Sequence, residues 1–231
     1  MTGQRPPPPG RRVFTELDPA VVRANVERVR ERLDPAARAS GRAPESVRLL
    51  AAVKYVPLDQ LGALEDAGIN LVGENRAHDL EAKARRHPGF EWHFIGQLQS
   101  RKVRQVLPHV TLIHSVATDS ALKELGKHAA AGTRVLVEVN VAGEESKAGI
   151  APDELGAFIA RCPVEVAGLM VMPPASTDPE DSRPHFARAR ELAAAHGLRE
   201  LSMGTSQDFE VAAQEGATIV RIGSVLFESP A

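Results

Sequence analysis

The feature that most constrains the fold of this chain is an alternation between two kinds of segment. Short apolar runs of strand length are separated by longer segments of helical composition. The apolar runs lie near residues 47–53, 69–72, 91–95, 110–113, 134–141, 164–169, 199–202 and 217–222. The helical segments lie at 58–67, 75–86, 100–107, 118–131, 152–161, 180–196 and 207–215. Because strands that alternate with helices indicate parallel βαβ units, this pattern in 231 residues predicts a single-domain (β/α)8 TIM barrel of the α/β class.

An additional helix is predicted before the first strand. Asp18 can cap its first turn, and Pro19 suits the first helical position. Apolar residues then recur on one helical face, at Val22, Val26, Val29 and Leu33. Pro35 and Gly41 lie around the predicted end of this helix.

Residues 1–14 are predicted to form a disordered tail, because they contain four consecutive prolines. The barrel would then occupy residues 15–231. A doubly wound open sheet is the alternative fold. It has less support, because no Gly-x-Gly-x-x-Gly follows the first predicted strand and the sequence contains no Walker-type loop.

Composition narrows the classes of function. The chain has 28 basic and 30 acidic residues, and no basic stripe is interleaved with aromatic residues, so nucleic-acid binding is not expected. No run approaches the roughly 18 apolar residues of a membrane helix. The single cysteine, Cys162, excludes an internal disulfide, and the N-terminus lacks the hydrophobic segment of a secretory signal. We therefore expect a cytoplasmic protein that binds no membrane, and the lack of a Cys cluster argues against a metal site.

Two hydroxyl-containing loops follow the last two predicted strands. The first is Ser202-Met203-Gly204-Thr205-Ser206, and the second is Arg221-Ile222-Gly223-Ser224. Either loop alone could be an ordinary turn with a serine cap. Loops after strands seven and eight of a barrel commonly bind phosphate through backbone N–H groups and small hydroxyls. Two such loops in succession favour a phosphate site.

The first predicted strand ends in a lysine, Lys54. On its own, a lysine at this position is most simply a solvated residue where the chain leaves the core. Closure of a barrel places strand one beside strand eight, so Lys54 would lie near the Arg221–Ser224 loop. A lysine amine beside a phosphate site suggests Schiff-base chemistry with a phosphorylated aldehyde, either pyridoxal 5'-phosphate (PLP) or a sugar phosphate.

Six short motifs, in this order and spacing, resemble the pyridoxal phosphate homeostasis proteins (the YggS and PROSC type), which are related to the barrel domain of alanine racemase. The resemblance runs from about Asp18 to Phe227. The motifs are 49-LLAAVKYVP-57, 73-GEN-75, 93-HFIGQLQSRK-102, 168-GLMVM-172, 202-SMGTSQD-208 and 221-RIGS-224.

The resemblance implies a PLP-binding barrel in which Lys54 forms the internal aldimine. It implies that Arg221 faces the pyridine nitrogen and that Asn75 lies near the cofactor. The phosphate would be held by two loops, through Ser202, Gly204, Thr205, Ser206, Gly223 and Ser224. Residues of the fifth strand exit also match, namely Asn140, Lys147 and Gly149.

The chain departs from the family pattern at a few positions. Arg76 and Ala77 replace a Tyr-Val-like pair, Thr205 replaces a Met, and Glu228 stands where a Gly is usual. None of these replacements changes Lys54. The Arg76-Ala77 replacement follows Asn75 directly and is expected to alter the contacts near it.

The implied site favours binding over catalysis. A cationic arginine at the pyridine nitrogen keeps that nitrogen unprotonated, which weakens the ring as an electron sink. A racemase also needs a second acid or base opposite the lysine. Tyr55 is adjacent to Lys54 and so points to the other side of an extended segment. His93 and His114 are the remaining candidates, although such histidines are more often hydrogen-bonded structure.

We therefore expect a monomer that holds PLP as a lysine aldimine, with little or no catalysis. It would take part in vitamin B6 homeostasis and pass PLP to PLP-dependent apoenzymes. An amino-acid racemase or other PLP-dependent enzyme remains an alternative, as does a Schiff-base aldolase that needs no cofactor.

Overall fold

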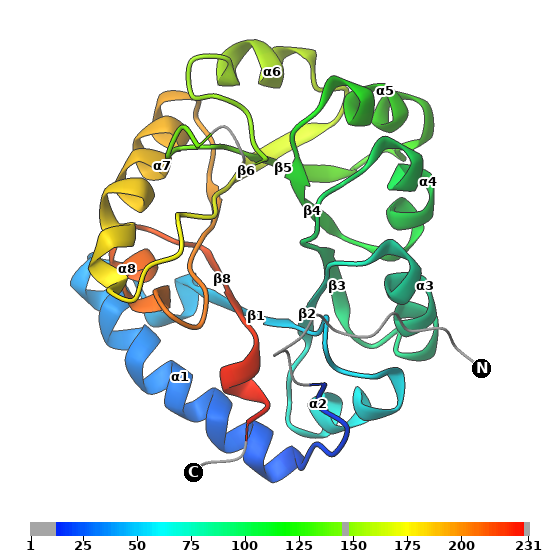
Figure 1. The fold of residues 1–231 in the computed structure, drawn as a ribbon, viewed down its shortest axis with the longest axis vertical. Helices are drawn as coiled ribbons and strands as arrows, with labels where there is room; N and C mark the ends of the chain where they lie inside the picture. Colours follow the sequence, from blue (N-terminus) through cyan, green and yellow to red (C-terminus); the bar gives the residue numbers. More distant parts are fainter. Residues whose placement is uncertain (1–12, 145–147, 229–231) are drawn as a thin grey trace.

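In the computed structural model, which describes residues 13–144 and 148–228, eight parallel strands form a closed barrel in sequence order. The predicted (β/α)8 fold is confirmed, and the open sheet is excluded because β1 pairs with β8, with Leu50 opposite Arg221. Figure 1 shows the strands around the centre and the helices outside them. The strands are β1 (Arg48–Ala52), β2 (Leu71–Glu74), β3 (Glu91–Phe94), β4 (Leu112–Val116), β5 (Arg134–Glu138), β6 (Glu165–Met170), β7 (Glu200–Ser202) and β8 (Ile219–Ile222).

Helices occupy every segment that the sequence predicts to be helical, although several are shorter than predicted. The α-helices are α1 (Pro19–Ala39), α2 (Gly62–Asp66), α3 (Ala77–Arg86), α4 (Val103–Val106), α5 (Asp119–His128), α6 (Leu155–Arg161), α7 (Arg183–Ala195) and α8 (Phe209–Gln214). Short 3-10 turns are η1 (Pro44–Ser46), η2 (Leu58–Gln60), η3 (Ser100–Lys102), η4 (Leu107–His109), η5 (Pro179–Ser182) and η6 (Ser224–Leu226). No helix of the described residues is long and apolar enough to cross a membrane.

The additional helix α1 lies in the outer ring between α8 and α2 (Figure 1). The Asp18 side chain accepts the Ala20 N–H as a cap, as predicted. The helix continues through Pro35 to Ala39, so Pro35 does not end it. The buried Asn25 amide donates to the carbonyl oxygens of Leu226 and Glu228, at 3.0 and 2.9 Å. These bonds attach α1 to the end of the barrel that follows β8.

The contacts of Phe14 bear on the predicted boundary between the tail and the barrel. Residues 1–12 of the predicted tail lie outside the described residues. Phe14, which the prediction placed in the tail, is buried and packs on Phe227 with ring centroids 5.3 Å apart. Its N–H donates to the Tyr55 carbonyl at 3.1 Å. Phe14 therefore belongs to the folded domain, because it covers the segment that follows β1.

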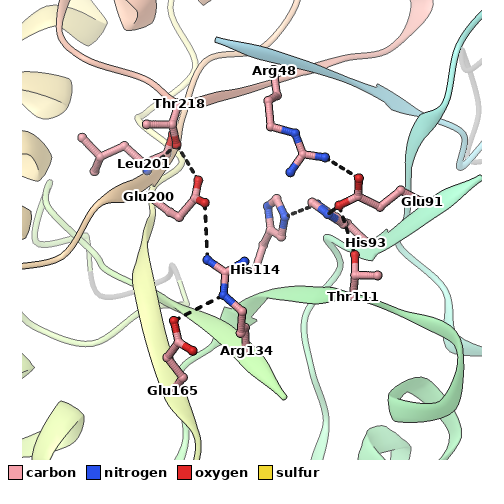
Figure 2. Close-up of polar contacts among 10 residues, drawn as sticks. All are labelled: Arg48, Glu91, His93, Thr111, His114, Arg134, Glu165, Glu200, Leu201 and Thr218. Atoms are coloured by element: carbon pink, nitrogen blue, oxygen red, sulfur yellow. Dashed lines mark hydrogen bonds and ion pairs between the residues drawn. The ribbon is translucent and has the colours of Figure 1, made fainter. Parts of the chain in front are cut away.

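The core has two parts, as expected for a barrel whose strand side chains alternate between the interior and the helices. The larger part lies between the strands and the helices. The smaller part fills the middle of the barrel with Leu50, Leu71, Leu112, Leu136, Ala167, Met170 and Ile219. Charged side chains surround the amino-terminal ends of the strands, where Arg134 contacts Glu165 and Glu200 at 3.3 and 3.4 Å (Figure 2).

Candidate functional site

The predicted site residues come together at the carboxyl ends of four neighbouring strands. Ser202 ends β7, Arg221 lies in β8, Lys54 follows β1 and Asn75 follows β2. These strands pair in the order β7, β8, β1, β2. Closure of the barrel therefore brings residues of the first two strands and the last two strands to one site. That these residues bind a ligand remains a prediction.

Two hydrogen bonds join the two predicted phosphate loops. The Gly223 N–H donates to Ser206 Oγ at 3.3 Å, and the Arg221 N–H donates to the Gly204 carbonyl at 3.0 Å. Within the first loop, the Thr205 N–H and Oγ1 both donate to Asp208 Oδ1, at 2.7 and 3.1 Å. These hydrogen bonds give the two loops a defined shape. Asp208, which the sequence interpretation missed, is the side chain that fixes the first loop.

Gly204 and Gly223, one in each loop, differ in backbone conformation and in the space around them. Gly204 has a φ of +89°, and a Cβ there would lie 2.6 Å from the Ala212 Cβ and 3.0 Å from the Phe209 Cα. Backbone conformation and packing both require glycine at this position. Gly223 has a negative φ, and a Cβ would meet nothing within 4 Å. Open space therefore lies beside the backbone of the second loop, where a side chain would otherwise project.

Lys54 is half-buried, and its Nζ lies 5.1 Å from the centre of the Tyr55 ring. Residues 54 and 55 form a turn rather than an extended segment, so the prediction that Tyr55 points away from Lys54 is wrong. The backbone that leads into Lys54 is fixed by two hydrogen bonds of Val53. The Val53 N–H donates to the Gly73 carbonyl at 2.9 Å, and the Val53 carbonyl accepts a hydrogen bond from Lys83 Nζ at 2.7 Å. The lysine at the end of β1 therefore starts from a rigid point.

A buried ion pair hydrogen-bonds the backbone next to Lys54 and Asn75. Lys83 Nζ lies 2.6 Å from Glu74 Oε2, and these side chains are 2% and 0% exposed. The other carboxylate oxygen, Glu74 Oε1, accepts the N–H groups of Asn75 and Arg76 at 2.6 and 3.0 Å. This Glu74–Lys83 pair thus holds the backbone at the exits of both β1 and β2. The sequence interpretation missed Lys83, although it shares a buried face of α3 with apolar residues.

Arg76 and Gly96 contact the same strand exit. The Arg76 guanidinium lies 3.4 Å from Asp79 Oδ2, on the side of α3, so the Arg76 departure from the family pattern leaves the Glu74–Lys83 pair in place. A Cβ at Gly96 would lie 2.0 Å from the Asn75 carbonyl oxygen. The Asn75 backbone is therefore packed directly against the exit of β3.

The fifth strand exit contributes a carboxyl group that the sequence interpretation missed. Glu138 ends β5, and burial raises the pKa of its carboxyl, an effect that Arg221 opposes. Beyond it, the Asn140 N–H donates to the Ile150 carbonyl at 3.0 Å, and Gly149 has a φ of +123°. Lys147 lies outside the described residues.

The Arg221 guanidinium is buried and held from two sides. Nη1 donates to Ser202 Oγ at 2.6 Å, and Nη2 donates to the Val171 carbonyl at 3.0 Å and to Met172 Sδ at 2.8 Å. Burial lowers the pKa of Arg221 to about 10, while Asp208 and Glu138 oppose that change. Arg221 is therefore a fixed cation at neutral pH.

A continuous hydrogen-bonded chain leads from Arg221 through the barrel interior. Ser202 Oγ lies 2.8 Å from His114 Nδ1, and His114 Nε2 lies 2.9 Å from His93 Nδ1. His93 Nε2 lies 3.0 Å from Glu91 Oε1. Figure 2 shows the two imidazoles and the Glu91 carboxylate in line. We call these five residues the Glu91–Arg221 chain.

Both imidazoles of this chain are buried, with His93 1% and His114 0% exposed. Burial lowers the pKa of His93 to about 4, although the Glu91 carboxylate opposes this, and burial lowers the pKa of His114 well below its usual value. Both rings are therefore neutral at pH 7. The sequence left two roles open for these histidines, a catalytic acid or base and a structural residue. Their hydrogen bonds to each other and to Ser202 are those of structural residues.

The other end of the chain reaches a cavity of about 350 Å³ at the amino-terminal mouth of the barrel. Its lining includes Arg48 and Glu91, and Arg48 Nη2 donates to Glu91 Oε2 at 2.6 Å. No group of three or more His, Cys, Asp or Glu side chains is placed to hold a metal ion anywhere in the described ranges.

Comparisons with known proteins agree with this geometry. Residues 17–230 match the family described as alanine racemase, N-terminal domain. The pyridoxal phosphate homeostasis protein of Aquifex aeolicus is 42% identical over 217 residues, which cover 87% of this chain and 95% of that protein. The chain belongs to the pyridoxal phosphate homeostasis protein family. The resemblance predicted from the motifs is thereby confirmed.

Other members of this family are similar over most of their length. The pyridoxal phosphate homeostasis protein of Pseudomonas aeruginosa is 37% identical, over 90% of this chain and 95% of that protein. PipY of Synechococcus elongatus, whose structure was solved with PLP bound, is 30% identical with a TM-score of 0.75, and the match covers 90% of this chain and all of PipY.

Proposed function

We propose that this protein binds PLP at the carboxyl ends of β7, β8, β1 and β2, with the Lys54 amine joined to its aldehyde as a Schiff base. The observation that carries the proposal is the hydrogen-bonded pair of loops beside β1, the strand that Lys54 follows. Family membership and the PLP-bound structure of PipY support it.

The residues present fit this cofactor in their chemistry. Ser206 and Ser224 offer hydroxyls for the phosphate, whereas the Thr205 hydroxyl already donates to Asp208. The open space beside Gly223 lets an oxygen approach the backbone. Arg221 supplies a fixed cationic donor for the pyridine nitrogen, and Asn75 supplies an amide. PLP when bound supplies an aldehyde that exchanges between amines, so a lysine can hold it and release it.

We further propose that the protein has little or no catalytic activity. The Arg221 cation keeps a bound pyridine nitrogen unprotonated, which weakens carbanion chemistry. His93 and His114 are buried and committed to the Glu91–Arg221 chain, so neither is placed to exchange protons with a substrate. One observation favours the racemase alternative. Burial raises the pKa of the Glu138 carboxyl, and a racemase needs a second acid or base besides the lysine.

Absorbance titration with PLP tests the binding proposal. The wild type is expected to gain a band of lysine-bound PLP, whereas Lys54→Ala is expected to show only free PLP, and Lys102→Ala is the matched control. A wild-type protein that takes up no PLP contradicts the proposal.

Incubation with single-enantiomer amino acids in deuterated water separates carrier from racemase. Enantiomerisation with α-deuterium incorporation, lost in Glu138→Gln, would favour the racemase. No exchange above buffer supports the carrier.

In the cell, the protein would act as a monomer in the cytoplasm, limit free PLP and pass the cofactor to apoenzymes. Mixing the PLP-loaded protein with a PLP-dependent apoenzyme, with free PLP trapped by an excess of a competing amine, measures direct transfer. Reactivation that is no faster than from free PLP contradicts the transfer role, and sedimentation velocity tests the monomer.

A further inference from the structure

The Glu91–Arg221 chain has chemically distinct ends that lie at opposite mouths of the barrel. Arg221 is a hydrogen-bond donor only, and the ionised Glu91 carboxylate is an acceptor only. We propose that Glu91, His93 and His114 are positioning residues that fix the Arg221 guanidinium through a hydrogen-bond chain with a single direction. The inference rests on the proposed function in one respect, that Arg221 faces the pyridine nitrogen of PLP.

The direction follows from counting hydrogens along the chain. Arg221 Nη1 donates to Ser202 Oγ, so the Ser202 hydroxyl hydrogen is free to point to His114 Nδ1. His114 then carries its hydrogen on Nε2, which donates to His93 Nδ1. His93 likewise carries its hydrogen on Nε2, which donates to Glu91 Oε1. Every link is satisfied once, with two neutral imidazoles and one carboxylate.

Other protonation states break this arrangement. If His93 were protonated, its Nδ1–H would face the Nε2–H of His114 across 2.9 Å. If His93 carried its hydrogen only on Nδ1, the Glu91 carboxylate would face an unprotonated nitrogen at 3.0 Å. A buried polar group that loses its partner is destabilising, so the chain selects one tautomer at each ring.

The position of Glu91 gives the chain a fixed anchor. Its two oxygens are held separately, since Oε2 accepts from Arg48 at 2.6 Å while Oε1 accepts from His93 at 3.0 Å and from the Thr111 hydroxyl at 3.2 Å (Figure 2). Arg48 keeps the carboxylate ionised and oriented. The orientation of Glu91 at the amino-terminal mouth thus fixes the orientation of Arg221 at the carboxyl mouth, through the three side chains between them.

The first experiment needs no cofactor. Long-range ¹H–¹⁵N correlation spectra of the histidine-labelled protein at pH 7 report the tautomer of each ring, with His93→Gln and His114→Gln used for assignment. Both rings are expected as neutral Nε2–H tautomers. A neutral Nδ1–H tautomer at either ring, or an imidazolium, would overturn the proposal.

The second experiment measures the effect on PLP bound to the full-length protein. His93→Gln breaks the chain at its centre, whereas Thr111→Val removes a contact to the same Glu91 oxygen without breaking the chain. His93→Gln is expected to weaken PLP binding about fivefold, the effect of one lost hydrogen bond, and to shift the absorbance maximum of bound PLP. Thr111→Val is expected to leave both unchanged.

The outcomes separate this inference from the proposed function. If the wild type binds no PLP, the proposed function fails, and the spectra of the imidazoles still decide the direction of the chain. If PLP binds equally to wild type and His93→Gln with the same spectrum, the positioning role is overturned. Near-ultraviolet circular dichroism of His93→Gln checks the fold, and Glu91→Gln provides a second, milder break at the anchor.

Discussion

The Glu74–Lys83 pair and the Glu91–Arg221 chain both lead to residues of the candidate site. They differ in charge, because the pair joins two ions whereas the chain passes through two neutral imidazoles. The pair is short and charged, and it lies on the outer side of the sheet between β2 and α3. The chain is long, is neutral at its two imidazoles and runs through the barrel interior. The pair fixes the backbone that carries Lys54 and Asn75, whereas the chain fixes the side chain of Arg221.

This difference shows how one barrel meets two requirements. In the proposed function, Lys54 forms and breaks a covalent bond with PLP, which requires a fixed backbone and a side chain that can move. Its backbone is fixed at the Val53 carbonyl, which accepts from Lys83. A residue that presents a fixed charge needs a rigid side chain, so its support ends on the guanidinium itself. The two systems should therefore fail in different ways.

The largest effect is expected from breaking the charged pair. Lys83→Met leaves the buried Glu74 carboxylate without its cation and should lower the free energy of unfolding by about 3–5 kcal/mol in urea denaturation. Lys127→Met is the matched control. It breaks an exposed Lys127–Glu124 pair and should cost less than about 1 kcal/mol. Similar losses in the two variants would contradict the role given to the buried pair.

An intermediate effect is expected from acidifying the neutral chain. The pKa of His93 falls from 6.5 to about 4 on folding, so between these values the unfolded chain binds a proton that the folded protein does not. The free energy of unfolding should therefore decrease as pH falls through this window, by about 3 kcal/mol for His93 alone. His114 changes in the same direction.

The same measurement in a variant isolates the contribution of the chain. In His93→Gln the decrease between pH 6.5 and 4 should be smaller than in the wild type, although the variant is less stable at pH 7. Desolvation alone would raise the pKa of Glu91, but hydrogen bonds from Arg48 and His93 outweigh it and lower this pKa from 4.5 to about 2. The contribution of Glu91 to the free energy of unfolding is therefore lost at lower pH, as pH falls from 4.5 to about 2. Identical slopes in wild type and His93→Gln would contradict the neutral state of the chain.

The smallest effect is the coupling between the two systems. Successive strand residues face opposite sides of the sheet, so Glu74 points toward α3 while His93 points into the barrel. The losses in free energy of unfolding caused by Lys83→Met and His93→Gln should add within about 0.5 kcal/mol in the double variant. A larger coupling would show that the pair and the chain form one system.

The sequence was sufficient for the fold because apolar periodicity is a local property. All eight strands lie within or beside the predicted runs, and the loops at Ser202–Ser206 and Arg221–Ser224 meet as predicted once β7 and β8 are neighbours. Element ends were less predictable. The α1 helix continues through Pro35, and the buried residues Leu33, Ala36 and Ala37 continue its apolar face on both sides of the proline. Phe14 packs on Phe227, a contact between residues far apart in the sequence.

The two supporting systems could not be predicted, because each depends on where long side chains point after the barrel closes. Lys83 is one of three basic residues in the second half of α3, and only its depth distinguishes it from Arg85 and Arg86. His93 and His114 come from adjacent strands, and their alignment with Ser202 needs the register of the closed barrel. Such contacts are set by tertiary geometry and leave no periodic signal in the sequence.

Borohydride reduction of the PLP-loaded protein shows directly whether Lys54 forms the proposed Schiff base with PLP. Reduction fixes the amine–aldehyde bond, and peptide mass spectrometry then locates the modified lysine. A single pyridoxyl-phosphate adduct is expected on the peptide that contains Lys54, and no adduct is expected in Lys54→Arg. An adduct on another lysine, or none in a protein that has taken up PLP, would contradict the proposal.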